Sequence, residues 1–174
     1  MDNNLKSIKD LPKRKRTRLP EFDYSSNGIY FVTICTQNRR KILSEIFVGQ
    51  GLGPAEIRLL KYGQIAEKQI FALEERFDNV KIENHVIMPD HIHLLVNIKN
   101  FAAEPCPCPT LSDVVCAFKS LTTRECKQKH KIEKLFQTSF YEHIIRNEQD
   151  FKETFEYIER NPYRWIEENT TPRI

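Results

Sequence analysis

The alternation of hydrophobic and polar residues along the chain predicts four strands and three helices. Four segments are rich in β-branched and aromatic residues or alternate between apolar and polar side chains, as strands do. These segments are residues 28–36, 80–88, 91–98 and 139–146. Apolar residues recurring at helical spacing predict helices over about 59–77 and 148–161, and a third helix is expected over about 110–129.

Two local signals set helix boundaries. Thr110-Leu-Ser-Asp113 fits a capping box that opens the second helix. We expect the last helix to stop at Pro162, because the residue before a proline avoids helical geometry. The order strand, helix, strand, strand, helix, strand matches the ferredoxin-like split βαβ pattern. The sequence therefore predicts an α+β domain, with an antiparallel sheet, helices on one face and an added C-terminal helix.

Two segments have no regular pattern, and we interpret both as surface loops. Residues 47–54 contain three glycines at alternate positions but lack the Gly-Lys-Ser/Thr ending of a phosphate-binding loop. Residues 101–109 contain Cys106 and Cys108, but the chain has no second cysteine pair at zinc-site spacing. Neither segment is a strong candidate site.

Composition narrows the class of protein. With 174 residues, 40% of them hydrophobic, the chain can bury one sizeable core, which favours a single domain. No run approaches 18 apolar residues, so a membrane-spanning helix is not expected. The N-terminus lacks the apolar core of a signal peptide, and five cysteines fit a reducing compartment. We therefore expect a cytoplasmic protein.

Positive charge is concentrated at the N-terminus. Residues 1–20 contain seven Lys/Arg and two Asp/Glu, whereas the rest of the chain sums to −2. These residues form a basic N-terminal arm, which could be a solvated tail or could contact nucleic-acid phosphates. Its candidate contacts are Lys13, Arg14, Lys15, Arg16 and Arg18. Lys119 and Arg124 are a second candidate DNA contact. A solvated helix face accounts for these two cations nearly as well.

The third strand carries a His-x-His sequence. Its core face is formed by Ile92, Leu94, Val96 and Ile98. His91 and His93 point to the opposite face, roughly 6–7 Å apart along the strand, so their imidazoles can converge on one cation. Such pairs are also common on strand surfaces without a metal. If Pro89-Asp90 is a two-residue turn, His85 faces the core and is a structural histidine rather than a third ligand.

The last helix supplies a candidate nucleophile. Its apolar stripe consists of Phe151, Phe155 and Ile158. Tyr157 and Asn161 lie together to one side of this stripe, one turn apart. A tyrosine one turn from an amide oxygen could attack beside a bound metal, although spacing alone favours a half-exposed packing tyrosine. Tyr141 and Tyr163 compete for the role but lack a polar partner one helical turn away.

His91-Ile-His93, with Tyr157-Ile-Glu-Arg-Asn161-Pro162 downstream, resembles the REP-associated tyrosine transposases. These are bacterial relatives of the insertion-sequence transposases, which belong to the HUH endonucleases and cut single-stranded DNA. Further segments match in the family's order and spacing, so that the resemblance covers about residues 11–166. They are Tyr30-Phe-Val-Thr-Ile-Cys-Thr-Gln-Asn38, Asn84-His-Val-Ile-Met-Pro-Asp-His-Ile-His-Leu-Leu-Val96, Ala117-Phe-Lys-Ser-Leu-Thr-Thr-Arg124 and Phe140-Tyr-Glu-His-Ile-Ile-Arg-Asn147.

The resemblance implies a role for each site residue. His91, His93 and Asn161 would bind a divalent cation, Mg²⁺ or Mn²⁺, and Tyr157 would be the nucleophile. The ligand types alone leave zinc open as well. The implied partner is single-stranded or hairpin DNA, bound by a monomer or a homodimer, and the implied catalytic domain spans residues 21–168. The 106–109 segment departs from the family's pattern, as does Phe136, where many relatives have tryptophan.

The implied chemistry is strand cleavage by a covalent route. The cation would act as a Lewis acid on the scissile phosphate, and Tyr157 would form a 5′-phosphotyrosine and leave a free 3′-hydroxyl. Two alternatives stay open: a non-catalytic protein that binds DNA hairpins, and a zinc-dependent hydrolase that activates water. The proton acceptor for Tyr157 is not identified, although Glu142 and His143 would be candidates if the fourth strand runs as predicted.

Overall fold

The computed structural model of the chain describes residues 27–48, 55–99 and 109–170. The basic arm, the glycine-rich run and the Cys106-Pro-Cys108 sequence lie outside these ranges. The strands are β1 (Gly28–Cys35), β2 (Ser44–Val48), β3 (Ala55–Leu59), β4 (Val80–Ile87), β5 (His91–Ile98) and β6 (Tyr141–Ile145). The helices are the short 3-10 turn η2 (Gln37–Arg39), then α1 (Lys61–Arg76), α2 (Leu111–His130) and α3 (Glu148–Thr170).

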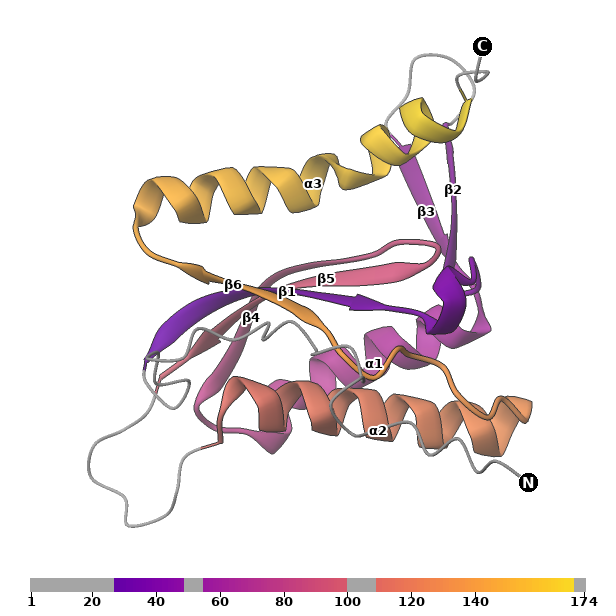
Figure 1. Cartoon of the computed structure of the whole chain (residues 1–174), viewed down its shortest axis with the longest axis horizontal. Coiled ribbons are helices and arrows are strands. Elements are labelled where there is room, and N and C mark those ends of the chain that lie inside the picture. Colours follow the sequence, from indigo (N-terminus) through magenta and orange to yellow (C-terminus); the bar gives the residue numbers. More distant parts are fainter. Residues whose placement is uncertain (1–26, 49–54, 100–108, 171–174) are drawn as a thin grey trace, which may run out of the picture.

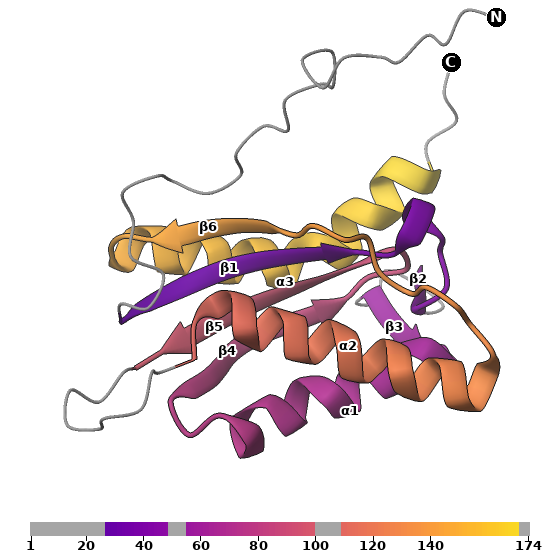
Figure 2. The ribbon, with the colours of Figure 1, turned by 60° about the horizontal axis from the view of Figure 1, so that its bottom comes forward.

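The main sheet has the strand order β4-β5-β1-β6, with each neighbouring pair antiparallel. Two split βαβ units give this order, because α1 and α2 each carry the chain past one intervening strand. Helices α1 and α2 cover one face of the sheet, and α3 crosses the other (Figure 1, Figure 2). The predicted ferredoxin-like α+β fold is confirmed. No helix in the described ranges combines the length and apolar character that crossing a membrane requires.

Each face of the sheet has its own hydrophobic core. The larger core lies between the sheet and α1 and α2, and includes the alternate residues Tyr30, Val32, Ile34, Ile92, Leu94, Val96 and Ile98. The smaller core lies under α3, where Ile158 packs with Val86, Met88 and Leu95. The capping box predicted at Thr110 and Asp113 opens α2. The sheet is therefore fixed from both sides, which holds the residues of β5 in a defined orientation.

A two-stranded sheet formed by β2 and β3 was not predicted. Phe47 and Val48, which the sequence pattern assigned to a loop, pair with β3 as part of this hairpin. Its strands are only five residues long and carry mixed polar and apolar side chains. Their pattern is therefore too short to stand out from a loop. The hairpin lies beside the C-terminal part of α3 (Figure 1), and both Ile46 and Trp165 pack against the smaller core.

The prediction that the last helix stops at Pro162 is wrong. Helix α3 continues to Thr170 with Pro162 inside it. An internal proline removes one backbone hydrogen bond and costs about 3 kcal/mol. The segment beyond it packs well enough to continue as helix, because Trp165 joins the smaller core and contacts the ammonium of Lys41, 4.9 Å from the ring centroid. This extension adds a wall to the candidate site.

Candidate active site

The register of β1 and β5 positions the two histidines. His93 lies opposite Thr33, and His91 lies opposite Cys35. Because side chains alternate along a strand and the neighbours Ile92 and Leu94 enter the larger core, both imidazoles point to the face that α3 covers. The predicted orientation of the His-x-His pair is confirmed.

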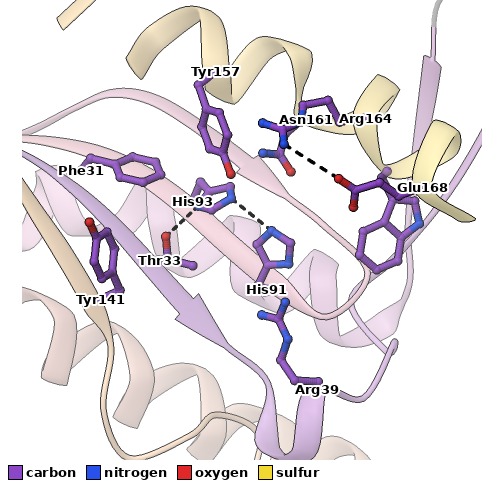
Figure 3. A pocket seen from close by; sticks show the side chains of 11 residues that line it. Phe31, Thr33, Arg39, His91, His93, Tyr141, Tyr157, Asn161, Arg164 and Glu168 are labelled. Carbon is purple, nitrogen blue, oxygen red and sulfur yellow. Dashed lines mark hydrogen bonds and ion pairs between the residues drawn. The ribbon is translucent and has the colours of Figure 1, made fainter. Parts of the chain in front are cut away.

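Both histidines line a cleft of about 410 Å³ between the sheet and α3. Strand residues form its floor, and helix residues form its upper wall (Figure 3). The lining residues are Phe31, Thr33, Arg39, His91, His93, Tyr141, Tyr157, Asn161, Arg164, Trp165 and Glu168. The four residues that the resemblance assigns to catalysis and metal binding therefore share one cleft, although two come from a strand and two from a helix.

In each histidine, one ring nitrogen faces the other histidine, and the second ring nitrogen is hydrogen-bonded to a different residue. The two Nε2 atoms are 3.1 Å apart. Nδ1 of His91 donates to the carboxylate of Asp90 at 2.6 Å, and Nδ1 of His93 lies 2.9 Å from the hydroxyl of Thr33. A hydroxyl can donate or accept, so Thr33 can support either tautomer of His93. The sheet thus presents two Nε2 atoms side by side with their rings fixed.

Asp90 is buried and ionised. Burial by itself would raise its pKa, but the hydrogen bond from His91 and the charges of His91, Arg39 and Lys41 outweigh this effect and lower it. Nε of Arg39 lies 3.1 Å from the second carboxylate oxygen. A carboxylate behind a histidine fixes its tautomer and raises the basicity of the other nitrogen. The sequence pattern assigned Asp90 only to a turn, so this role was missed.

His93 is held in its neutral form. Burial, together with the nearby His91 and Arg39, lowers the pKa of His93 from 6.5 to about 3. Its ring stacks on Phe31, with centroids 5.0 Å apart, and only 4% of the residue is exposed. A neutral imidazole has a lone pair for a cation, whereas a protonated one does not.

Tyr157 projects from α3 over this pair. Its ring packs against His93 at 5.5 Å between centroids and edge-on against Phe31 at 5.8 Å. Figure 3 shows the hydroxyl directed at His93. Asn161, one turn later, is buried and lines the same cleft. Tyr157 is 38% exposed as a residue, although its ring packs on both Phe31 and His93.

The donor set fits a divalent cation. Two nitrogen ligands at right angles on a metal, each at about 2.1 Å, lie roughly 3.0 Å apart, close to the observed separation of the Nε2 atoms. Asn161 contributes an amide side chain to the same cleft. Within residues 27–48, 55–99 and 109–170, no cluster of three or more His, Cys, Asp or Glu side chains could hold a metal. A third protein ligand in this cleft would then have to be of another type, and the amide of Asn161 is the candidate.

Other residues singled out in the sequence lie elsewhere. His85 pairs with Leu94, as predicted, and its ring meets Phe71 edge-on, away from the cleft. Neither Glu142 nor His143 lines the cleft, and His143 instead bonds the carboxylate of Asp150 at 3.0 Å. Tyr163 is exposed outside the cleft. Tyr141 does line it, and so remains a second tyrosine near the imidazoles.

The second predicted DNA contact lies on the far side of the sheet. Lys119 and Arg124 belong to α2, which packs on the face opposite to the cleft (Figure 1). The ammonium of Lys119 donates to the main-chain oxygens of Thr138 at 2.8 Å and Ser139 at 3.4 Å. These bonds tie Lys119 to the segment before β6, and the DNA contact of Lys119 and Arg124 stays a prediction.

Comparison with known proteins identifies the class to which this fold and cleft belong. The profile of the family described as "Transposase IS200 like" matches residues 24–161. The chain therefore belongs to the IS200-like transposase family, whose members are tyrosine transposases.

Two relatives from Haemophilus influenzae are each 29% identical to the chain. One is an uncharacterised protein, and the alignment covers 87% of this chain and 89% of the relative. The other is provisionally named a REP-associated tyrosine transposase, and the alignment covers 82% of this chain and 74% of the relative. A solved structure of a REP-associated tyrosine transposase bound to a REP hairpin has a TM-score of 0.58 and 23% identity, covering 79% of this chain and 67% of that one. This last similarity supports the fold.

Proposed function

We propose that the protein cleaves and rejoins single-stranded DNA beside a hairpin, with Tyr157 as the nucleophile. The observation that carries the proposal is the convergence of Tyr157, Asn161 and two imidazoles in one cleft. A metal-free surface histidine pair would not need a buried carboxylate behind it, nor a tyrosine packed directly over it. Family membership supports the same reaction class.

In the proposed reaction, the oxygen of Tyr157 attacks a phosphodiester in line with its 3′-oxygen. A bond forms between the tyrosine oxygen and phosphorus, and the bond from phosphorus to the 3′-oxygen breaks. The phenol gives up one proton and the departing 3′-oxygen takes one up, so the step is balanced. The product is a 5′-phosphotyrosine and a free 3′-hydroxyl, which can reverse the step or attack with a new strand end.

His91, His93 and Asn161 would hold a divalent cation, with Mg²⁺ or Mn²⁺ as the expected ions. When bound, the cation supplies Lewis-acid stabilisation of the charge that develops on the phosphate. The chain itself contributes orientation. Asp90 and Thr33 fix the two imidazoles, and the contacts of Tyr157 with Phe31 and His93 fix the phenol before DNA arrives. Such pre-organisation lowers the entropic part of the barrier.

Single-stranded or hairpin DNA is the proposed substrate. A solved relative holds a REP hairpin, and this chain shares its fold. The arm residues Lys13, Arg14, Lys15, Arg16 and Arg18 are the proposed backbone contacts, because clustered cations release counterions from nucleic acid. The protein would act as a monomer or homodimer, with residues 21–168 as the catalytic domain and a cytoplasmic site of action.

The test uses hairpins taken from DNA flanking the gene, labelled at the 5′ or the 3′ end. The wild type, Tyr157→Phe and Tyr141→Phe are incubated with each hairpin in Mn²⁺ or in EDTA, and covalent protein–DNA species are separated on denaturing gels. Tyr141→Phe is the matched control, since it removes a hydroxyl from the same cleft. We expect a covalent adduct in Mn²⁺ but not in EDTA. The adduct should carry the 3′-end label, because Tyr157 stays joined to the fragment downstream of the cut. Only Tyr157→Phe should abolish it.

Two other results would favour the alternatives. Cleavage without an adduct, retained in Tyr157→Phe, would indicate a hydrolase that activates water. Tight binding of the hairpin with no cleavage in any of several flanking sequences would indicate a binding protein that has kept the fold.

A further inference from the structure

The helix beyond Pro162 brings an arginine beside the candidate nucleophile. The guanidinium carbon of Arg164 lies 5.5 Å from the centroid of the Tyr157 ring. One of its terminal nitrogens lies 3.8 Å from the carboxylate of Glu168, one turn further along α3. Both Arg164 and Glu168 line the cleft (Figure 3). The sequence pattern ended the helix before these residues, so neither was considered a site residue.

We propose that Arg164 is a catalytic residue that binds the scissile phosphate, and that Glu168 is the counterion it leaves when DNA enters. The proposal rests on the proposed function, since it deepens the description of that same site. Arg164 would act through its charge and hydrogen bonds and would take no part in the proton transfers.

The position of Arg164 follows from the period of the helix. Residues 157, 161 and 164 are spaced four and three apart, so they form one row along α3, beside its buried stripe, that lines the cleft. The nucleophile, the amide and the guanidinium therefore enter the cleft from one rigid element. A phosphate attacked by Tyr157 has to lie beside its hydroxyl, within the space that this row and the two imidazoles enclose.

Of the two arginines that line the cleft in the described ranges, only Arg164 is held weakly. Arg39 bonds the buried carboxylate of Asp90 and the sulfur of Cys35, so its guanidinium already has a structural function. The pair between Arg164 and Glu168 is long, and more than half of each side chain is exposed. An exposed ion pair of this kind contributes at most about 1 kcal/mol, so a phosphate can displace the carboxylate.

A guanidinium suits the charge that develops during the reaction. The phosphate gains negative charge as the tyrosine oxygen approaches, and a planar guanidinium can donate two parallel hydrogen bonds to its oxygens. The imidazoles lie on the sheet side of the cleft and Arg164 lies on the helix side. The phosphate would then be stabilised from two directions.

A purely structural role is the competing explanation. Arg164 could serve only to pack on Tyr157 and pair with Glu168, in which case its loss would loosen the helix. The two explanations differ in what they change: a structural role alters stability and metal binding, whereas a phosphate contact alters the rate at saturating DNA.

The experiment compares Arg164→Ala, Arg164→Lys and Arg160→Ala in the same single-turnover adduct assay with Mn²⁺ and a flanking hairpin. Arg160 is the matched control, because it is exposed on the same helix and does not line the cleft. We expect Arg164→Ala to slow adduct formation at saturating DNA about 10²- to 10³-fold, as loss of a preorganised charge-stabilising donor does. Arg164→Lys should recover part of the lost rate. The Mn²⁺ affinity and thermal stability of both Arg164 variants should match those of Arg160→Ala.

A rate for Arg164→Ala within about threefold of that for Arg160→Ala would overturn the proposal. The proposal would also be overturned if Arg164→Ala lost stability or Mn²⁺ affinity to an extent that accounts for its loss of rate. If the wild type forms no adduct on any of several flanking hairpins, the proposed function fails, and hairpin affinity then tests the phosphate contact separately. In that case Arg164→Ala should reduce the slope of log affinity against log salt by about 0.7 to 0.9 relative to Arg160→Ala, and equal slopes would refute the contact.

The role of Glu168 has its own test. Glu168→Gln removes a negative charge that would repel the incoming phosphate, so hairpin binding should tighten by up to about fivefold. Glu167→Gln is the control, since it removes the same charge from an exposed neighbour that does not line the cleft. Equal effects of the two variants would refute the counterion role.

Discussion

Asp90 and His91 are consecutive residues whose side chains are hydrogen-bonded to each other at 2.6 Å. The next residue, Ile92, points into the larger core on the opposite face of the sheet. Asp90 is the last residue of the β4–β5 turn and His91 is the first of β5, so the carboxylate reaches the ring from the side of the turn. The bond leaves Nε2 of His91 facing His93. The turn thus orients the candidate metal ligand as well as reversing the chain.

Replacing Asp90 by asparagine should therefore weaken metal binding. Because a carboxylate behind a ligating histidine increases ligand basicity and fixes the ring, Asp90→Asn should lower Mn²⁺ affinity about 10- to 100-fold. Titration calorimetry on the free protein measures this without any DNA. Asp78→Asn, at an exposed position, is the control. An unchanged affinity in a folded Asp90→Asn protein would contradict the account of the turn.

The depressed pKa of His93 predicts a pH dependence of stability. Between pH 6.5 and about 3 the unfolded chain protonates this ring and the native protein does not, so stability should fall as the pH falls through this window. The slope contributed is at most about 1.4 kcal/mol per pH unit. Urea unfolding of metal-free protein across this range, for wild type and His93→Gln, isolates the effect. Identical pH dependences would show that burial does not hold the ring neutral.

Gly63 marks a close approach between α1 and the chain before β2. A Cβ atom at this position would lie 2.0 Å from the main-chain oxygen of Leu43, which also accepts a bond from the amide of Leu60. Gly63→Ala should therefore destabilise the protein by about 1–3 kcal/mol, although alanine is the better helix former. The exposed neighbour Gln64→Ala should change stability by no more than about 0.5 kcal/mol. A stabilised Gly63→Ala protein in chemical denaturation would refute this contact.

The basic arm should contribute electrostatic affinity for DNA. Lys13, Arg14, Lys15 and Arg16 changed together to alanine should weaken hairpin binding and reduce the slope of log affinity against log salt by up to about 3. Fluorescence anisotropy at several salt concentrations measures both quantities. An unchanged slope would remove the arm from the interface, whatever the affinity at one salt concentration.

Periodicity predicted the elements whose pattern is long or strict. The alternation in residues 91–98 gave the correct strand and the correct faces for both histidines. Phe151, Phe155 and Ile158 gave the correct buried stripe of α3. These signals work because burial of one face repeats at the period of the backbone.

The partners that tune the site could not be predicted in the same way. Thr33 lies opposite His93 only because of the register between β1 and β5, which joins residues 60 positions apart. Arg164 and Glu168 were missed because Pro162 is a sound local signal for a helix end, and tertiary packing of Trp165 outweighs it. Local patterns therefore placed the candidate ligands and the candidate nucleophile on their strand and helix, whereas the residues that orient and surround them depend on long-range contacts.

The central claim is that Tyr157 becomes covalently joined to DNA. The most direct measurement traps the Mn²⁺-dependent adduct on a hairpin, digests protein and DNA, and locates the nucleotide-modified peptide by tandem mass spectrometry. The account predicts a 5′-linked phosphate on Tyr157, with none on Tyr141, which lines the same cleft. A nucleotide attached to Tyr141, or hairpin cleavage with no modified tyrosine at all, would contradict it.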